Sequence, residues 1–293
     1  RKCKSFSTGS QLEEYTMIQK PASSRRGFRY GAHIRANGIR QHYLRFGEGG
    51  PPLLLIPGII STAAMWAFVA ERLSQYFDVY VLDVRGRGLS ECGEHLDYGL
   101  DSCAADIVEF AGALKLPPYI VVGHSMGARI AIRAARATPA ALERIVLIDP
   151  PVAGPGRRVY PIPLLQMLNQ VRAAQLGDVS GLLRLRSPAE WPEAQLLVRA
   201  EWLHTCDERA VEAAYRGFHE DDIHTDLRFI TKPTDFILAS RGDVTTPADA
   251  DEIRRLLPGS AIRYVADAGH QIQLDNIEGL FEVFGELFNR AFS

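Results

Sequence analysis

The stretch YIVVGHSMGAR at residues 119–129 constrains the fold of this chain more than any other. A short, β-branched apolar run ends in Gly-His-Ser-Met-Gly and passes directly into residues 128–137, which are rich in helix formers. This order is typical of a strand, a sharp turn and a helix, with a serine held at the apex of the turn. The pattern predicts that Ser125 is a nucleophile and that the backbone N–H of Met126 points into the same space.

Strand and helix patterns alternate on both sides of this turn. Apolar runs of strand length occur at residues 52–56, 78–83, 144–149, 236–240 and 261–265. Helical patterns occur at residues 66–77, 101–116, 247–257 and 276–292. Such alternation calls for βαβ units and a mainly parallel sheet flanked by helices, an α/β fold. Near the start, Asn37-Gly38 between two β-prone runs predicts an antiparallel hairpin over residues 28–46.

The alternation stops after the sixth predicted strand. Residues 150–230 carry few strand signals and several helical ones, among them residues 164–176 and 194–205. We therefore expect an α/β core made of residues 28–150 and 231–293, with a helical lid at residues 151–230. Residues 1–27 are rich in Ser, Lys and Arg and lack the apolar segment of a secretory signal, so they are interpreted as a disordered tail or a leader.

A serine hydroxyl needs a base, and the chain order of this topology is serine, acid, histidine. Among the 8 histidines, His270 follows a predicted strand and the Ala268-Gly269 turn late in the chain, so it is the predicted base. Two carboxylates compete to orient it, because Asp149 and Asp243 each follow a buried strand. Topology alone favours Asp243.

An oxyanion needs preorganised donors. Besides the Met126 N–H, the loop after the strand at residues 52–56 should supply one, the N–H of Ile59, with that of Ile60 as the alternative.

These motifs resemble the α/β-hydrolase superfamily from about residue 30 to the end of the chain. Several stretches resemble more closely the deformylases of bacterial nicotinate breakdown. They are ANGIRQHYLRFG (36–47), VAERL (69–73), VLDVRGRGLS (81–90), GHSMGAR (123–129), DPPVAGPGRR (149–158), AEWLHTC (200–206) and AGH (268–270).

The resemblance implies hydrolysis of a small acidic N-acyl amide through an acyl-enzyme. It also favours Asp149 as the acid, so that both aspartates remain candidates. A carboxylate on the substrate would call for an arginine fork. Candidates for substrate contact are an aliphatic residue, three arginines and two aromatic residues: Ile60, Arg129, Arg157, Arg158, Trp191 and Trp202.

Composition and charge restrict the partners, cofactors and location that we expect for this chain. Net charge is −2 with both signs interspersed, so no nucleic-acid partner is expected, and no apolar run is long enough for a membrane span. The 4 cysteines form no Cys-x-x-Cys pair, which argues against a metal site and favours a reducing, cytoplasmic location. We expect a small-molecule substrate and no cofactor, and the sequence gives no oligomeric state. An esterase, a lactonase, a C–C bond hydrolase or a slow ligand-binding receptor could use the same residues.

Overall fold

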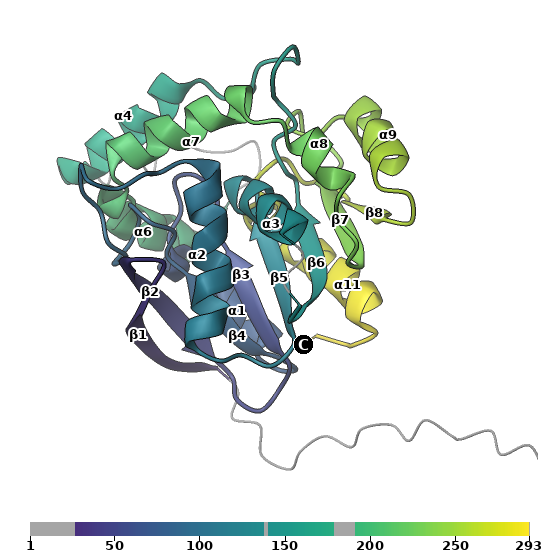
Figure 1. The fold of residues 1–293 in the computed structure, drawn as a ribbon. Helices are drawn as coiled ribbons and strands as arrows, with labels where there is room; N and C mark the ends of the chain where they lie inside the picture. The colour runs from purple at the N-terminus through teal and green to yellow at the C-terminus, as the bar shows by residue number, and fades with distance from the viewer. Residues whose placement is uncertain (1–26, 138–139, 179–190, 293) are drawn as a thin grey trace, which may run out of the picture.

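The computed structural model describes residues 27–137, 140–178 and 191–292, and within them eight strands form one sheet (Figure 1). In chain order the strands are β1 (Phe28–Ala36), β2 (Ile39–Phe46), β3 (Pro52–Ile56), β4 (Asp78–Leu82), β5 (Tyr119–His124), β6 (Leu142–Ile148), β7 (Thr234–Ala239) and β8 (Ala261–Val265). The spatial order is β1-β2-β4-β3-β5-β6-β7-β8. Strand β2 runs antiparallel to β1 and β4, and the other neighbouring pairs are parallel. The predicted α/β fold with a mainly parallel sheet is confirmed.

The first two strands form the hairpin that the Asn-Gly pair predicts. Asn37 and Gly38 have φ angles of 48° and 75°, and positive φ at both positions is the requirement of a type I′ turn. Register pairs Ala36 with Ile39 across this turn.

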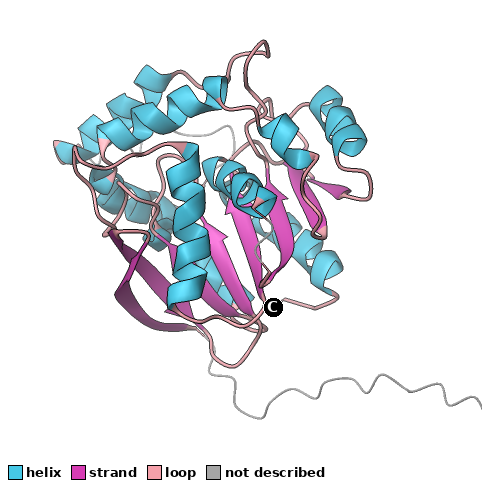
Figure 2. Cartoon of the chain, in the orientation of Figure 1, coloured by secondary structure: helices cyan, strands magenta, loops and turns pink. Residues whose placement is uncertain are grey.

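Helices cover both faces of the sheet, which explains why its central strands are apolar runs without alternation. Strands β3, β4, β5 and β7 are buried along their whole length. In Figure 2, α2 and α3 lie on the near face, and α1 and α11 lie behind. The helices outside the β6–β7 connection are η1 (Ala63–Trp66), α1 (Ala67–Leu73), α2 (Leu100–Ala113), α3 (Met126–Arg136), α9 (Pro247–Leu256), α10 (Ile272–Asp275) and α11 (Ile277–Phe288).

The strand order reverses at β3, which lies between β4 and β5. The chain leaves β3 toward β4 on one side and then returns to pair β5 on the other side. In open α/β sheets such a reversal leaves a crevice at the carboxyl ends of the strands, where ligands bind. The loop after β3 and the turn after β5 meet at this crevice.

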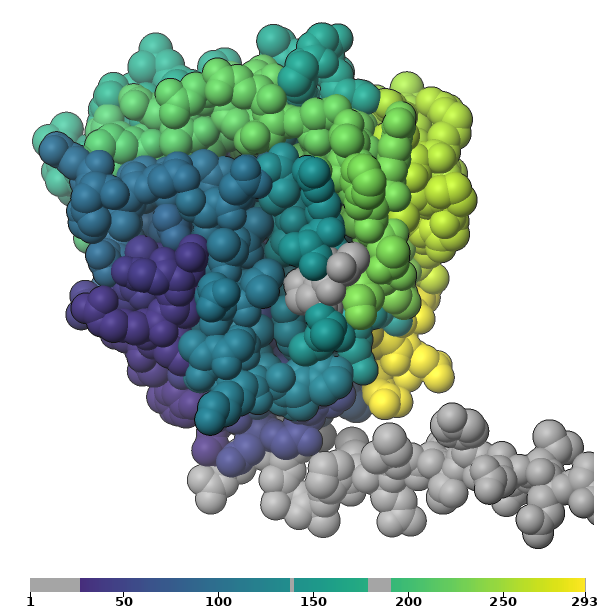
Figure 3. Space-filling model, in the orientation of Figure 1, coloured from purple at the N-terminus to yellow at the C-terminus, as the bar shows by residue number. Residues whose placement is uncertain are grey.

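The connection between β6 and β7 is helical where it is described. It contains α4 (Leu164–Gln175), α6 (Glu193–Trp202), η2 (Leu203–Thr205), α7 (Glu208–Glu220) and α8 (Ile223–Leu227). In Figure 1, α4, α6 and α7 lie at the carboxyl end of the sheet, and Figure 3 shows α7 as a green band above α2. Residues 179–190 of the predicted lid and residues 1–26 of the predicted tail lie outside the described residues.

The short helix α8 packs on α3 and α9. Its buried Asp226 accepts hydrogen bonds from Arg133 (2.5 Å) and Arg136 (2.8 Å) of α3. Helix α8 therefore extends the layer that covers the sheet. No helix in the described part of the chain has the length and apolar character needed to cross a membrane.

Candidate active site

Ser125 lies at a strained turn between β5 and α3. Its φ and ψ are 55° and −118°, a conformation that costs a non-glycine residue about 1–3 kcal/mol. The flanking glycines are required by close packing, because a Cβ on Gly123 would lie 2.3 Å from the Gly127 carbonyl oxygen. A Cβ on Gly127 would lie 2.0 Å from the carbonyl oxygen of Ile56 at the end of β3. The local sequence thus forces the strand and helix together and leaves the serine at the apex.

Three side chains from distant parts of the chain meet in one hydrogen-bonded series. The Ser125 Oγ lies 2.9 Å from His270 Nε2, and the His270 Nδ1 lies 2.7 Å from Asp149 Oδ2. Asp149 is fully buried, and its positive φ of 43° turns it at the end of β6. A carboxylate at Nδ1 selects the imidazole tautomer that leaves Nε2 free to accept a proton from the serine.

The structure does not bring Asp243 to the histidine. Asp243 is exposed at the cavity wall, and its backbone carbonyl accepts a hydrogen bond from Arg158 (2.7 Å). Because Asp149 already lies against His270 Nδ1, the topological preference for Asp243 is corrected in favour of Asp149.

The two residues expected to supply the oxyanion donors are Met126, which follows the serine in the chain, and Ile59, which lines the same cavity. Met126 is the first residue of α3, and the first N–H groups of a helix have no acceptor within the helix. Ile59 and Ile60 line the same cavity as Ser125. The buried Arg87 holds their loop, because its Nε donates to the Ile59 carbonyl at 2.7 Å.

Tyr160, from the start of the insertion, also reaches the histidine. Its hydroxyl lies 3.4 Å from His270 Nε2, and its ring packs 4.9 Å from that of Phe218 between centroids. Burial raises the pKa of Tyr160, so the hydroxyl keeps its proton and can act as a donor.

The side chain of His124 holds the loop that carries His270. Its Nε2 donates to the carbonyl of His270 at 2.9 Å, and its ring lies 5.0 Å from that of His270 and 5.2 Å from that of Trp66. Burial lowers the pKa of His124 to about 3, so the imidazole is neutral in the folded protein.

This buried histidine predicts acid lability. An unfolded histidine has a pKa near 6.5, so the unfolded chain binds a proton that the fold rejects. The contribution of the neutral imidazole to the free energy of unfolding is complete above pH 6.5 and is lost as the pH falls toward 3. At pH 5 the loss amounts to about 2 kcal/mol. We expect His124→Gln, whose amide can still donate to the His270 carbonyl, to flatten the decline of unfolding free energy between pH 7 and pH 5. The exposed His204→Gln is the control and should keep the wild-type curve; parallel curves for His124→Gln would contradict the argument.

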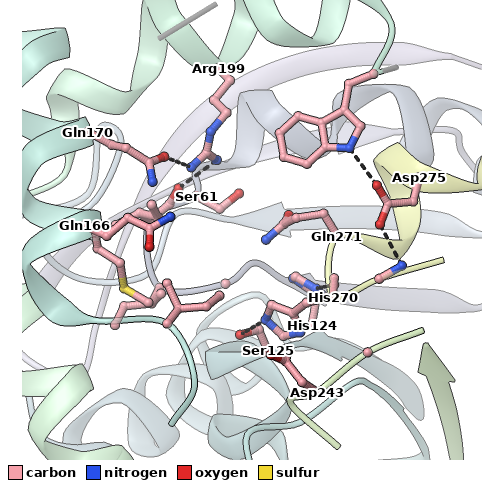
Figure 4. Close-up of a pocket in the computed structure, with 18 of the residues that line it drawn as sticks. Ser61, His124, Ser125, Gln166, Gln170, Arg199, Asp243, His270, Gln271 and Asp275 are labelled. Carbon is pink, nitrogen blue, oxygen red and sulfur yellow. Dashed lines mark hydrogen bonds between the residues drawn. The ribbon is translucent and has the colours of Figure 1, made fainter. Parts of the chain in front are cut away.

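A cavity of about 580 Å³ opens above the serine (Figure 4). Of the residues predicted to contact substrate, Ile60 and Trp191 line it. The Trp191 Nε1 donates to Asp275 Oδ1 at 2.7 Å, and the Asp275 Oδ2 accepts from the N–H of Gly269 at 2.8 Å. The tryptophan of the insertion is thereby tied to the residue before His270.

The three arginines proposed from sequence do not line this cavity, and that expectation is corrected. Arg129 is buried and donates to four backbone carbonyls, those of Pro151, Ala153, Gly217 and Asp221. Arg157 pairs with Glu252 at 2.6 Å, and Arg158 pairs with Asp249 at 2.7 Å. Trp202 likewise packs against the hydrophobic core and does not line the cavity.

Sequence reasoning missed most of the polar lining. The residues concerned are Gln166, Gln170, Arg199, Arg241, Gln271 and Asp275. One signal was present, because Arg199 occupies the same helical stripe as Leu196 and Leu203, three residues before it and four after it. A cation on an apolar stripe is a candidate for a buried role.

A family model described as the alpha/beta hydrolase family matches residues 53–283. The chain therefore belongs to the α/β-hydrolase family, and it is a hydrolase. It is 52% identical over 259 residues to an N-formylmaleamate deformylase of Pseudomonas putida, across 88% of this chain and 96% of that protein.

Solved structures agree with this assignment. The crystal structure of an N-formylmaleamic acid deformylase variant from Pseudomonas putida is 49% identical, with a TM-score of 0.83 over 87% of this chain and all (100%) of that one. The structure of E-2-(acetamidomethylene)succinate hydrolase has a TM-score of 0.72 over 89% of this chain and 100% of that one. At 23% identity, this second likeness shows the fold alone.

Proposed function

We propose that this chain removes the formyl group from N-formylmaleamate or a closely similar small acidic N-formyl amide. The observation that carries the proposal is the 52% identity to a deformylase with that substrate, which spans 96% of the relative. The hydrogen-bonded series of Ser125, His270 and Asp149 supports acyl transfer through a covalent intermediate.

The first half of the reaction forms a formyl-enzyme. Ser125 Oγ attacks the formyl carbon while His270 Nε2 takes the hydroxyl proton, and Asp149 stabilises the imidazolium. The N–H groups of Met126 and Ile59 receive the developing oxyanion. Collapse breaks the C–N bond, and His270 returns its proton to the leaving amide nitrogen.

The second half releases formate. Water attacks the formyl ester as His270 accepts one of its protons, the bond from carbon to Ser125 Oγ breaks, and the serine regains a proton. The hydroxyl of Tyr160, close to His270 Nε2, can donate to the attacking or leaving heteroatom.

We also propose that residues 151–230 act as a lid. The support is that the insertion supplies one side of the cavity wall, including Tyr160, Gln166, Gln170 and Arg199. Closure over a hydrolytic site excludes bulk water and fixes which substrates fit.

Incubation with N-formylmaleamate should release one formate per molecule consumed, and a fluorophosphonate probe should label Ser125. Ser125→Ala should abolish labelling and lower kcat on the order of 10⁶-fold. Turnover of p-nitrophenyl esters without formate release would reject this substrate and leave an esterase. Tight retention of ligand with very slow turnover would instead favour a receptor.

A further inference from the structure

Two buried arginines and one partly buried arginine have no carboxylate partner among the described residues: Arg87 and Arg129, and Arg199. Two of them are satisfied by backbone. Arg87 donates to the carbonyls of Ile59, Arg85 and Ala210 at 2.7–3.0 Å. Arg129 donates to four carbonyls at 2.8–3.0 Å, and neither of these two side chains lines the cavity.

Arg199, on α6, is different. Within the described part of the chain it donates to Gln170 Oε1 at 2.9 Å and to the Ile60 carbonyl at a long 3.4 Å. A guanidinium carries five N–H donors and does not lose its proton, so donors remain for a further acceptor. The accessible part of Arg199 belongs to the cavity wall.

An anion would complete this arrangement. Burial lowers the pKa of Arg199, and within the described ranges no carboxylate lies close enough to offset the loss of water around the charge. A cation held this way costs free energy, and an anion that enters the cavity recovers it through charge-assisted hydrogen bonds.

Arg199 is placed to bind one end of a substrate whose other end reacts at Ser125. Figure 4 shows Arg199 and Gln170 on the wall across the cavity from Ser125 and His270. Gln170 comes from α4 and fixes the guanidinium plane, and Gln166 and Gln271 add neutral amides to the lining. A guanidinium with neutral amides beside it is suited to bind a carboxylate.

We propose that Arg199, oriented by Gln170, binds the carboxylate of the substrate and so sets the specificity for acidic N-formyl amides. This inference rests on the proposed function for the identity of the substrate. The occupant is a small molecule with one carboxylate remote from the scissile bond.

Arg241 is the matched control. It also lines the cavity, but it is exposed and its guanidinium donates to the backbone carbonyl of Asp267. Water screens an exposed cation, so its loss should weaken anion binding less than the loss of Arg199 does.

The first test compares two substrates: N-formylmaleamate and its analogue with a primary amide in place of the carboxylate. Arg199→Gln should lower kcat/KM for the acid about 10- to 100-fold, mainly through KM, and should lower it much less for the neutral analogue. Arg199→Lys should recover part of the loss, and Arg241→Gln should lower kcat/KM for the acid less than Arg199→Gln does. Equal losses on both substrates, or a loss no larger than that of Arg241→Gln, would overturn the assignment.

A second test does not depend on the deformylase activity. Maleate should slow the labelling of Ser125 by a fluorophosphonate in the wild type and in Arg241→Gln, and should fail to slow it in Arg199→Gln. Labelling in the absence of maleate checks that each variant is folded. If N-formylmaleamate is not a substrate but this pattern holds, the proposed function fails and the anion site stands. Equal protection of wild type and Arg199→Gln, or no protection of either, would overturn the anion site.

Discussion

Asp149→Asn should lower kcat by about 10⁴-fold, while Asp243→Asn should change it by less than about threefold. The asparagine keeps the shape of the side chain but can present an N–H to His270 Nδ1, which stabilises the wrong imidazole tautomer and removes the negative charge beside the imidazolium. Asp149 is positioned for this effect, at 2.7 Å from Nδ1 and without solvent exposure. Asp243 is exposed and does not bond the histidine in the structure.

The measurement is single-turnover labelling by a fluorophosphonate together with formate release, so that the result does not depend on one substrate. Both variants replace an aspartate near the end of neighbouring strands, which makes Asp243→Asn a close control for the loss of one negative charge. Similar mild losses in both variants would show that neither carboxylate orients the histidine. A large loss in Asp243→Asn alone would reverse the assignment.

The order of the elements could be predicted because each local pattern had one consistent interpretation. The apolar runs become buried parallel strands, and the Asn37-Gly38 pair forms its hairpin. Gly123 and Gly127, on either side of Ser125, mark a contact that only residues without a Cβ permit. The predicted helix at residues 66–77 is shorter, since α1 ends at Leu73 and a turn leads into β4.

The choice of acid could not be made from topology, because β6 and β7 are parallel neighbours whose carboxyl ends meet at one edge. A carboxylate after either strand is therefore close to the same loop. What separates them is backbone conformation: Asp149 has a positive φ, which the residues before Pro150 do not reveal.

The substrate arginines were mispredicted for a related reason. From the sequence, Arg129 after the Ser125 turn and the arginines at the start of the insertion were expected to bind substrate. In the structure, Arg129 donates to backbone carbonyls and the other two form ion pairs with carboxylates. Arg199 stands directly before the AEWLHTC stretch, but its role depends on how α6 packs against the loop that holds Ile60. Packing between distant segments has no local sequence pattern.

The second large expected effect concerns stability. Gly127→Ala should lower the free energy of unfolding by about 3 kcal/mol or more, since its Cβ would lie 2.0 Å from the Ile56 carbonyl oxygen and 2.7 Å from that of Pro57. Both obstacles are backbone atoms, so relief requires α3 to move away from the end of β3. That movement would also displace the Met126 N–H from the oxyanion position, and we expect kcat to fall at least about 10²-fold in the protein that remains folded.

Gly112→Ala is the matched control, because Gly112 is also helical and a Cβ there would meet nothing within 4 Å. At an exposed helical position such as Gly112, alanine is favoured over glycine by about 0.5–1 kcal/mol, so this variant should be slightly more stable than wild type. Urea unfolding of the two variants should thus move the midpoint in opposite directions. If Gly127→Ala were as stable and active as wild type, α3 could not approach the end of β3 as closely as the structure places it.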